Sequence, residues 1–168
     1  MLDAAYWAVC LVLVASGATK VAEPDAFARA LGAFGVLPQR SGALDPTGRW
    51  TAVVIGLVEI GVGFNALVIG GSLLGWVTAA AFALFTVVVL VARARGLSSC
   101  GCFGARSGTP NLAHAALNAG SAVVCGAAAL AGPVALADGL DGLGRATAIA
   151  VVAGVLAVAA AIIVVDTR

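Results

Sequence analysis

Five apolar stretches, each long enough to cross a lipid bilayer as a helix, dominate this chain of 168 residues. The hydrocarbon core of a bilayer is about 30 Å thick, and a helix needs roughly 20 apolar residues to span it. Because that core offers no water to backbone groups, a spanning segment must satisfy its own hydrogen bonds, as a helix does. The stretches run over Leu2–Val21, Trp50–Ile69, Ser72–Ala92, Leu112–Leu130 and Gly144–Val165. The sequence therefore predicts an all-α fold, a polytopic membrane helical bundle.

The composition favours one integral membrane domain over residues 1–168. Hydrophobic residues make up 62% of the chain and charged residues 10%, whereas soluble proteins have about 25% charged residues. The net charge of +1 offers no basic surface to nucleic acid, so the expected partner is the lipid bilayer and no nucleic acid. Asp3 stands where a signal peptide carries basic residues, and the first stretch is too long for one. We therefore expect it to remain as a span.

The longest polar segment follows the first apolar stretch. Pro24 suits the first turn of a helix, and Phe27, Leu31 and Phe34 fall on one helical face. A loop with this apolar stripe would expose it to water. We expect a short helix over about residues 24–36 that lies at the membrane surface, with an ordinary solvated connection as the alternative.

Basic residues are unequally divided between the two ends of a five-span bundle. Only Arg145 falls at one end. By the positive-inside rule, the end with more basic residues lies in the cytoplasm. This predicts a protein of the bacterial inner membrane with its N-terminus outside, its C-terminus in the cytoplasm, and the CGCFG loop at the cytoplasmic face. The residues at the crowded end are Lys20, Arg29, Arg40, Arg49, Arg93, Arg95, Arg106 and Arg168.

The segment SSCGCFGAR, between the third and fourth apolar stretches, places Cys100 and Cys102 one glycine apart. Cysteines at this spacing can reach the Cα separation of about 4.4 to 6.8 Å that a disulfide needs, but the ring is small and strained. Strained, accessible disulfides exchange readily and are typical of redox-active sites. The pattern predicts a pair that interconverts between dithiol and disulfide. The alternative is two incidental cytosolic cysteines.

The residues around the pair refine this prediction. Arg95 and Arg106 flank the cysteines, and nearby positive charge favours the thiolate form. Phe103 and Gly104 are typical of a membrane-surface anchor and a turn. Because Cys102 is nearer to Arg106 in the chain, we expect Cys102 to attack first.

Three motifs, SGATKVAEPDAFARALGAFGVLP, VEIGVGFNALVIG and SCGCFG, resemble in order and spacing the MauE family of methylamine utilisation, within the broader DoxX-like group. The resemblance extends from the first apolar stretch to the end of the fourth. It implies four core transmembrane helices, with the fifth, C-terminal span outside the match, and thiol or disulfide redox chemistry beside the membrane. It also implies a thioredoxin-like or other redox partner protein and a disulfide-rich substrate enzyme outside the cytoplasm. The basic residues place the cysteine loop on the opposite side, and we retain the topology that they predict.

Polar residues form one stripe along the fourth apolar stretch, at spacings of three, four, three and four residues. In lipid, such a stripe must face the bundle, where one interpretation is hydrogen bonding between helices. The other is a cavity below the cysteine loop, in which His114 exchanges protons with a thiol or a membrane quinone. The stripe comprises Asn111, His114, Asn118, Ser121 and Cys125.

Glu59 is the one acidic residue well inside an apolar stretch, a depth at which ionisable groups indicate function. By the resemblance, Glu59 and Lys20 both match positions of the family. Lys20 has a long stem and can lean inward toward Glu59. One interpretation is structural, with Glu59 either in an ion pair or protonated and hydrogen-bonded. The other is that Glu59 delivers protons for thiol oxidation.

Cys10 and Cys125 are expected at similar depth in the membrane, counted at 1.5 Å per helical residue. Contact between them is therefore one possibility. The alternative is that each is a small buried apolar residue.

Two other functions remain open from the sequence. A Cys-x-Cys pair can bind Cu(I) through two thiolates, whereas a zinc site needs more ligands than His114 can add. The DoxX-like resemblance also allows a non-enzymatic scaffold that recruits a redox enzyme. The sequence has no nucleotide-binding, haem-attachment or flavin motif, which leaves a membrane quinone or a partner protein as electron acceptor. We predict a membrane thiol-disulfide redox protein with no metal, with Cys100, Cys102, His114 and Glu59 as catalytic residues and Asn111, Asn118 and Lys20 as cofactor contacts.

Overall fold

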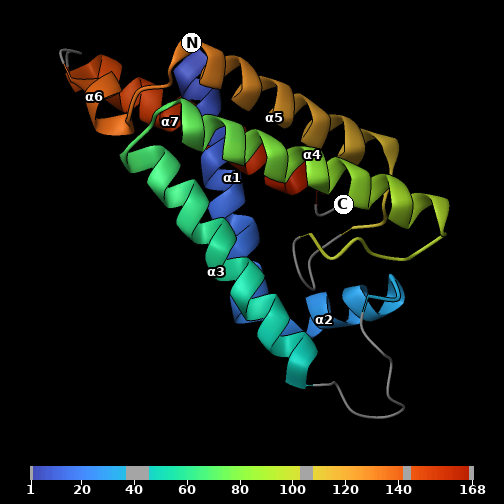
Figure 1. Cartoon of the computed structure of the whole chain (residues 1–168). Helices are drawn as coiled ribbons and strands as arrows, with labels where there is room; N and C mark the ends of the chain where they lie inside the picture. The colour runs from blue at the N-terminus through green and yellow to red at the C-terminus, as the bar shows by residue number, and fades with distance from the viewer. Residues whose placement is uncertain (1, 37–45, 103–107, 142–144, 167–168) are drawn as a thin grey trace.

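The computed structural model describes residues 2–36, 46–102, 108–141 and 145–166, which form helices joined by short connections (Figure 1). No strand occurs in these ranges, so the all-α prediction is confirmed. The helices are α1 (Leu2–Ala22), α2 (Pro24–Ala33), α3 (Pro46–Val68), α4 (Ser72–Ala94), α5 (Leu112–Ala131), α6 (Leu136–Leu140) and α7 (Arg145–Asp166).

Four helices, α1, α3, α4 and α5, are long and apolar enough to cross a membrane. They correspond to the four core spans expected from the sequence, which confirms that part of the fold. Large apolar side chains stay exposed on their outer faces, as an integral membrane protein requires. Examples are Leu57 and Phe64 of α3 and Leu84 and Val87 of α4.

The fifth predicted span corresponds to α7, a helix of 22 residues that packs against α1. It is not among the four helices that are clearly long and apolar enough to cross, so a fifth span stays a prediction. Gly144, at the predicted start of that span, lies outside the described residues.

Close approach between helices depends on glycine where α1 meets α3. A methyl group added to Gly56 would lie 2.6 Å from the carbonyl oxygen of Gly17. One added to Gly63 would lie 2.8 Å from the carbonyl oxygen of Cys10. Such small residues let helix backbones pack tightly in lipid and fix the register of one helix on the other.

The helices α3 and α4 leave a tight turn and diverge, while α5 runs beside α4 (Figure 1). The short helix α2 lies near the open end of this arrangement and packs against α3. It corresponds to the helix expected over about residues 24–36 and ends at Ala33. Phe27 and Leu31 of α2, and Phe34 just after it, line a cavity. Its place at the membrane surface stays a prediction.

At the opposite end of the bundle, two hydrogen bonds to backbone carbonyls join the helices. Trp7 Nε1 donates to the carbonyl of Val134 at 3.0 Å. The amide of Gly71 donates to the carbonyl of Pro133 at 2.8 Å. These two hydrogen bonds join α1 and the α3–α4 turn to the connection after α5.

Candidate functional site

The cysteine loop folds back into the bundle after α4 ends. The side chains of Cys100 and Cys102 are 1% and 4% exposed. Gly101 between them has a φ of +75°, a left-handed conformation that favours glycine. A methyl group on Gly101 would lie 2.6 Å from the Ala30 side chain and 3.2 Å from the Phe27 ring, both of α2. The helix α2 therefore covers the dithiol closely.

A buried ion pair lies beside the loop. Lys20 Nζ of α1 is 2.8 Å from Glu59 Oε2 of α3, and the two side chains are 1% and 7% exposed. Lys20 Nζ also donates to Ser16 Oγ at 2.7 Å and to the carbonyl of Cys102 at 2.6 Å. An ammonium group has three protons to donate, so these three acceptors satisfy it. A buried charge pair is tolerated when its remaining hydrogen bonds are made in this way.

Ser16 connects the ion pair to the loop. Its hydroxyl lies 3.0 Å from Glu59 Oε2 and 2.8 Å from the Cys102 carbonyl oxygen, and it donates toward both. A hydroxyl has one proton, so it serves one acceptor at a time. Lys20 and Ser16 thus hold the Cys102 carbonyl and fix the loop to α1 and α3.

Aromatic rings enclose the ammonium group. Lys20 Nζ lies 5.2 Å from the centroid of the Phe27 ring and 5.4 Å from that of Phe85. Both distances allow cation–π attraction, which strengthens where water is excluded. Side chains from α1, α2, α3 and α4 therefore converge on the cysteine loop.

The two thiols differ in acidity. The hydrogen bond from the Cys102 thiol lowers the pKa of Cys100 to about 7, with a smaller contribution from the charge of Lys20. That same hydrogen bond, with burial, raises the pKa of Cys102 well above its ordinary value. At neutral pH, roughly half of Cys100 is thiolate while Cys102 stays protonated.

This order is opposite to the sequence expectation that Cys102 attacks first. Arg106, on which that expectation rested, lies outside the described residues, as do Phe103 and Gly104. Arg95 lines the same cavity as both cysteines, and its Nη1 donates to the carbonyl of Phe34 at 3.0 Å. Its predicted effect on the thiols stays a prediction. The acidity of Cys100 comes first from the neighbouring thiol.

A cavity of about 400 Å³ adjoins the dithiol. Both cysteines, Lys20 and Glu59 contribute to its lining. Most of the remaining lining is apolar. It includes Phe27 and Leu31 of α2, Phe34 just after α2, Ile55 of α3, and Phe85 and Val88 of α4.

The polar stripe of α5 is buried except at its half-buried cap Asn111. The described residues that line the cavity do not include Asn111, His114 or Asn118. Asn111 caps α5, since its Oδ1 accepts from the His114 amide at 2.8 Å. Asn118 Nδ2 donates to the His114 carbonyl at 3.1 Å. These bonds give both asparagines a local role in α5, and the roles predicted for the stripe in redox chemistry stay predictions.

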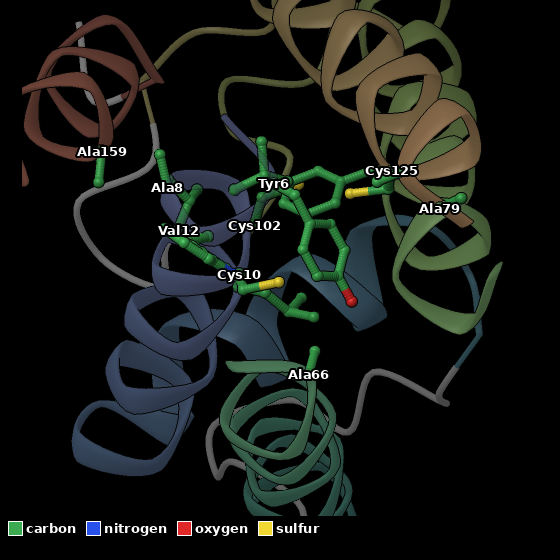
Figure 2. Close-up of a cluster of buried hydrophobic side chains, with 14 of the residues drawn as sticks. Tyr6, Ala8, Cys10, Val12, Ala66, Ala79, Cys102, Cys125 and Ala159 are labelled. Atoms are coloured by element: carbon green, nitrogen blue, oxygen red, sulfur yellow. The ribbon is translucent and has the colours of Figure 1, made fainter. Parts of the chain in front are cut away.

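The other two cysteines lie in the core around Tyr6 (Figure 2). Cys10 and Cys125 are fully buried, and both are free thiols. The structure therefore favours the interpretation of each as a small apolar core residue.

A site for a larger metal cluster is not formed by the part of the chain that the structure describes. Nowhere in that part do three or more His, Cys, Asp or Glu side chains come together as metal ligands. The two-thiolate Cu(I) alternative needs only Cys100 and Cys102, and metal analysis of the purified protein tests it.

Sequence reasoning missed two features of the site. Ser16 lies four residues before Lys20, so both fall on one face of α1, and this spacing was the available signal. The apolar stripe Phe27, Leu31 and Phe34 predicted a short helix at the membrane surface, but not that these side chains line the dithiol cavity. Neither this contact of α2 nor the contacts of Ser16 follow from hydropathy alone.

Comparison with known families matches residues 1–133 to the family described as methylamine utilisation protein MauE. The matched range includes α1 to α5, and with them the ion pair, Ser16 and both loop cysteines. No curated protein and no solved structure matches the chain.

Proposed function

The chain belongs to the MauE family of methylamine utilisation proteins, and we propose that it is a membrane thiol-disulfide redox protein whose Cys100 and Cys102 interconvert between dithiol and disulfide. The observation that carries this proposal is the placement of two thiols, one residue apart, beside a cavity and the buried Lys20–Glu59 pair, and their unequal acidity supports it. Cys100, the more acidic thiol, is the proposed nucleophile, and Cys102 beside it is the proposed resolving thiol. This arrangement is typical of dithiols that exchange rather than of structural cysteines.

The exchange proceeds through a mixed disulfide at Cys100. Its thiolate attacks a disulfide of the partner protein, so one bond forms to Cys100 and one partner sulfur leaves as a thiolate. Cys102 then loses its proton and attacks Cys100, which closes the Cys100–Cys102 bond and releases the second partner thiol. The partner gains two electrons and this protein loses two. In the reverse direction, the same mixed disulfide oxidises a partner dithiol.

We assign Lys20, Glu59 and Ser16 to positioning rather than to exchange itself. Lys20 and Ser16 hold the carbonyl of Cys102, and Glu59 holds both of them. The positive charge of Lys20 also favours the thiolate form of both loop cysteines. Proton delivery by Glu59, with His114 as a second carrier, remains the alternative role.

The proposed partner is a thioredoxin-like or other redox protein at the basic end of the bundle. Lys20 lies in the last turn of α1, Arg93 in the last turn of α4 with Arg95 just after it, Arg29 in α2 and Arg49 in the first turn of α3. Side chains of α1, α2, α3 and α4 line one cavity together with both cysteines. By the positive-inside rule, we place this end of the protein in the cytoplasm and the N-terminus outside.

Covalent trapping tests the order of attack. Cys102→Ser removes the resolving thiol and leaves Cys100, so it should accumulate a mixed disulfide with the partner that reductant releases. Cys100→Ser should accumulate none. Cys125→Ser, a buried cysteine away from the loop, is the matched control and should behave as wild type. Full function of the double variant lacking both loop thiols would refute the redox proposal and leave the scaffold.

A further inference from the structure

We propose that the cavity beside the dithiol binds a lipid-soluble quinone, which accepts the two electrons of Cys100 and Cys102. This inference rests on the proposed function, because it names the electron acceptor of the same dithiol. It moves the expected quinone away from the α5 stripe, where the sequence had suggested it, to the space between α2, α3 and α4.

The size and lining of the cavity suit an aromatic ring. Its volume of about 400 Å³ falls within the range of about 300–1,000 Å³ that is usual for small-molecule sites. Three phenyl rings contribute to its walls, those of Phe27, Phe34 and Phe85. Aromatic rings pack favourably against each other in offset or edge-to-face geometry. Aliphatic side chains supply most of the rest.

One part of the cavity wall lies on the outer face of α4. The thiols themselves are 1% and 4% exposed beneath α2, so a folded protein cannot contact their sulfur atoms in this conformation. Leu84, which lines the cavity, is 60% exposed on the outer face of α4. Because α4 is long and apolar enough to cross a membrane, this part of the cavity wall is expected to adjoin lipid. An occupant dissolved in the bilayer can enter there.

The polar groups of the cavity favour a quinone over a phospholipid acyl chain. The two sulfur atoms are a source of electrons, and an acyl chain has no group that accepts them. Lys20 and Glu59 both line the cavity, and the three protons of the Lys20 ammonium are donated to Glu59, Ser16 and the Cys102 carbonyl, so Lys20 acts on a quinone oxygen through its charge and not through a hydrogen bond. A phospholipid with its phosphate at Arg95 is the competing occupant.

The reaction is balanced without a further reagent. Two S–H bonds break and one S–S bond forms between Cys100 and Cys102. Two electrons and two protons leave the dithiol, and the quinone becomes a quinol. The disulfide is then available to oxidise a dithiol of the partner protein, which returns the pair to its starting state.

Adjacent valines of α4 provide a matched test. Val88 lines the cavity, whereas Val87 does not and is 55% exposed toward lipid. Reduced protein in nanodiscs is mixed without oxygen with decylubiquinone or menadione, and quinol absorbance and free thiols are followed. We expect wild type and Val87→Trp to reduce the quinone with loss of two thiols per quinol. Val88→Trp fills the cavity and should slow the reaction by at least about tenfold.

Two further measurements separate binding from chemistry. The double variant Cys100→Ser/Cys102→Ser should be labelled at the cavity by a photoreactive azidoquinone and form no quinol. The equilibrium of the dithiol with dithiothreitol buffers should be unchanged in Val88→Trp, which shows that the thiols are intact.

The outcomes distinguish this inference from the proposed function. If the thiols cycle in dithiothreitol and Cys102→Ser traps a partner, but quinone is not reduced, the quinone site is wrong and the proposed function stands. Equal rates for Val88→Trp and Val87→Trp, or a retained phospholipid that quinone does not displace, would also overturn the site. If the thiols do not cycle at all, both proposals fail.

Discussion

Replacing Lys20 with Met is expected to destabilise the protein by about 3–5 kcal/mol, the range for removing one partner of a buried ion pair. Met keeps the length and apolar character of the stem but removes the charge. Glu59, whose side chain is 7% exposed, then keeps a buried carboxylate with only Ser16 as a described hydrogen-bond partner. The Cys102 carbonyl also loses its hydrogen bond from Lys20 at 2.6 Å.

The double variant Lys20→Met/Glu59→Met gives the decisive comparison. Replacing both members of a buried pair by apolar residues is often nearly neutral. The double variant should therefore be more stable than Lys20→Met alone, and the effects of the two single variants should not add. Unfolding in mixed micelles of increasing sodium dodecyl sulfate content, followed by circular dichroism, measures these free energies.

A second ion pair in the chain serves as the control. Arg49 Nε lies 3.0 Å from Asp25 Oδ1, but the two side chains are 55% and 41% exposed. Solvent screens such a pair, so Arg49→Met should change the free energy of unfolding by at most about 1 kcal/mol. The reasoning is refuted if Lys20→Met is as stable as wild type, or if the effects at Lys20 and Glu59 simply add.

Three further predictions concern the loop. The rate of alkylation of native Cys100 by a small neutral maleimide should rise with pH, with a midpoint near pH 7. Cys102→Ala should move that midpoint up toward about 8.5, because the hydrogen bond that favours the thiolate is lost. An unmoved midpoint would exclude this hydrogen bond as the cause. Gly101→Ala should reduce thermal stability more than Gly96→Ala, since both have positive φ but only at Gly101 does the added methyl group meet α2; equal losses would contradict the close contact. Ser98 is exposed, so Ser98→Cys, in a protein whose two loop thiols are replaced by Ser, should react with an impermeant maleimide only after cells are permeabilised. Labelling of intact cells would show the opposite topology.

Hydropathy predicted the four core spans because lipid imposes a simple requirement on each segment. The same requirement singled out Lys20 and Glu59, since a charge within an apolar stretch is unusual. Their pairing was only one of several interpretations. The pairing depends on the register of α1 against α3, which is fixed where the Gly17 and Gly56 backbones meet. That contact joins positions far apart in the chain, and no local pattern reveals it.

The pKa difference between Cys100 and Cys102 shows why charges close in the sequence were not enough to predict which thiol is more acidic. Distance along the chain favoured Cys102, because charge was counted without knowing where each side chain points. In the folded protein, Arg95 donates to the carbonyl of Phe34, and the hydrogen bond between the thiols dominates their acidity. The acidity of a buried thiol is set by the groups that surround it in space.

The position of α2 relates the two proposed reactions of the dithiol. The helix α2 lines the cavity proposed for the quinone and also covers the cysteines from a partner protein. It packs against α3, its Ala30 lies close to Gly101, and the exposed Asp25–Arg49 pair joins it to the start of α3. The loop itself is held by the buried Lys20–Glu59 pair, which is harder to disrupt. If both proposals hold, exchange with a partner requires movement of α2 to expose the sulfur atoms, whereas a quinone in the cavity can oxidise the dithiol while α2 covers it.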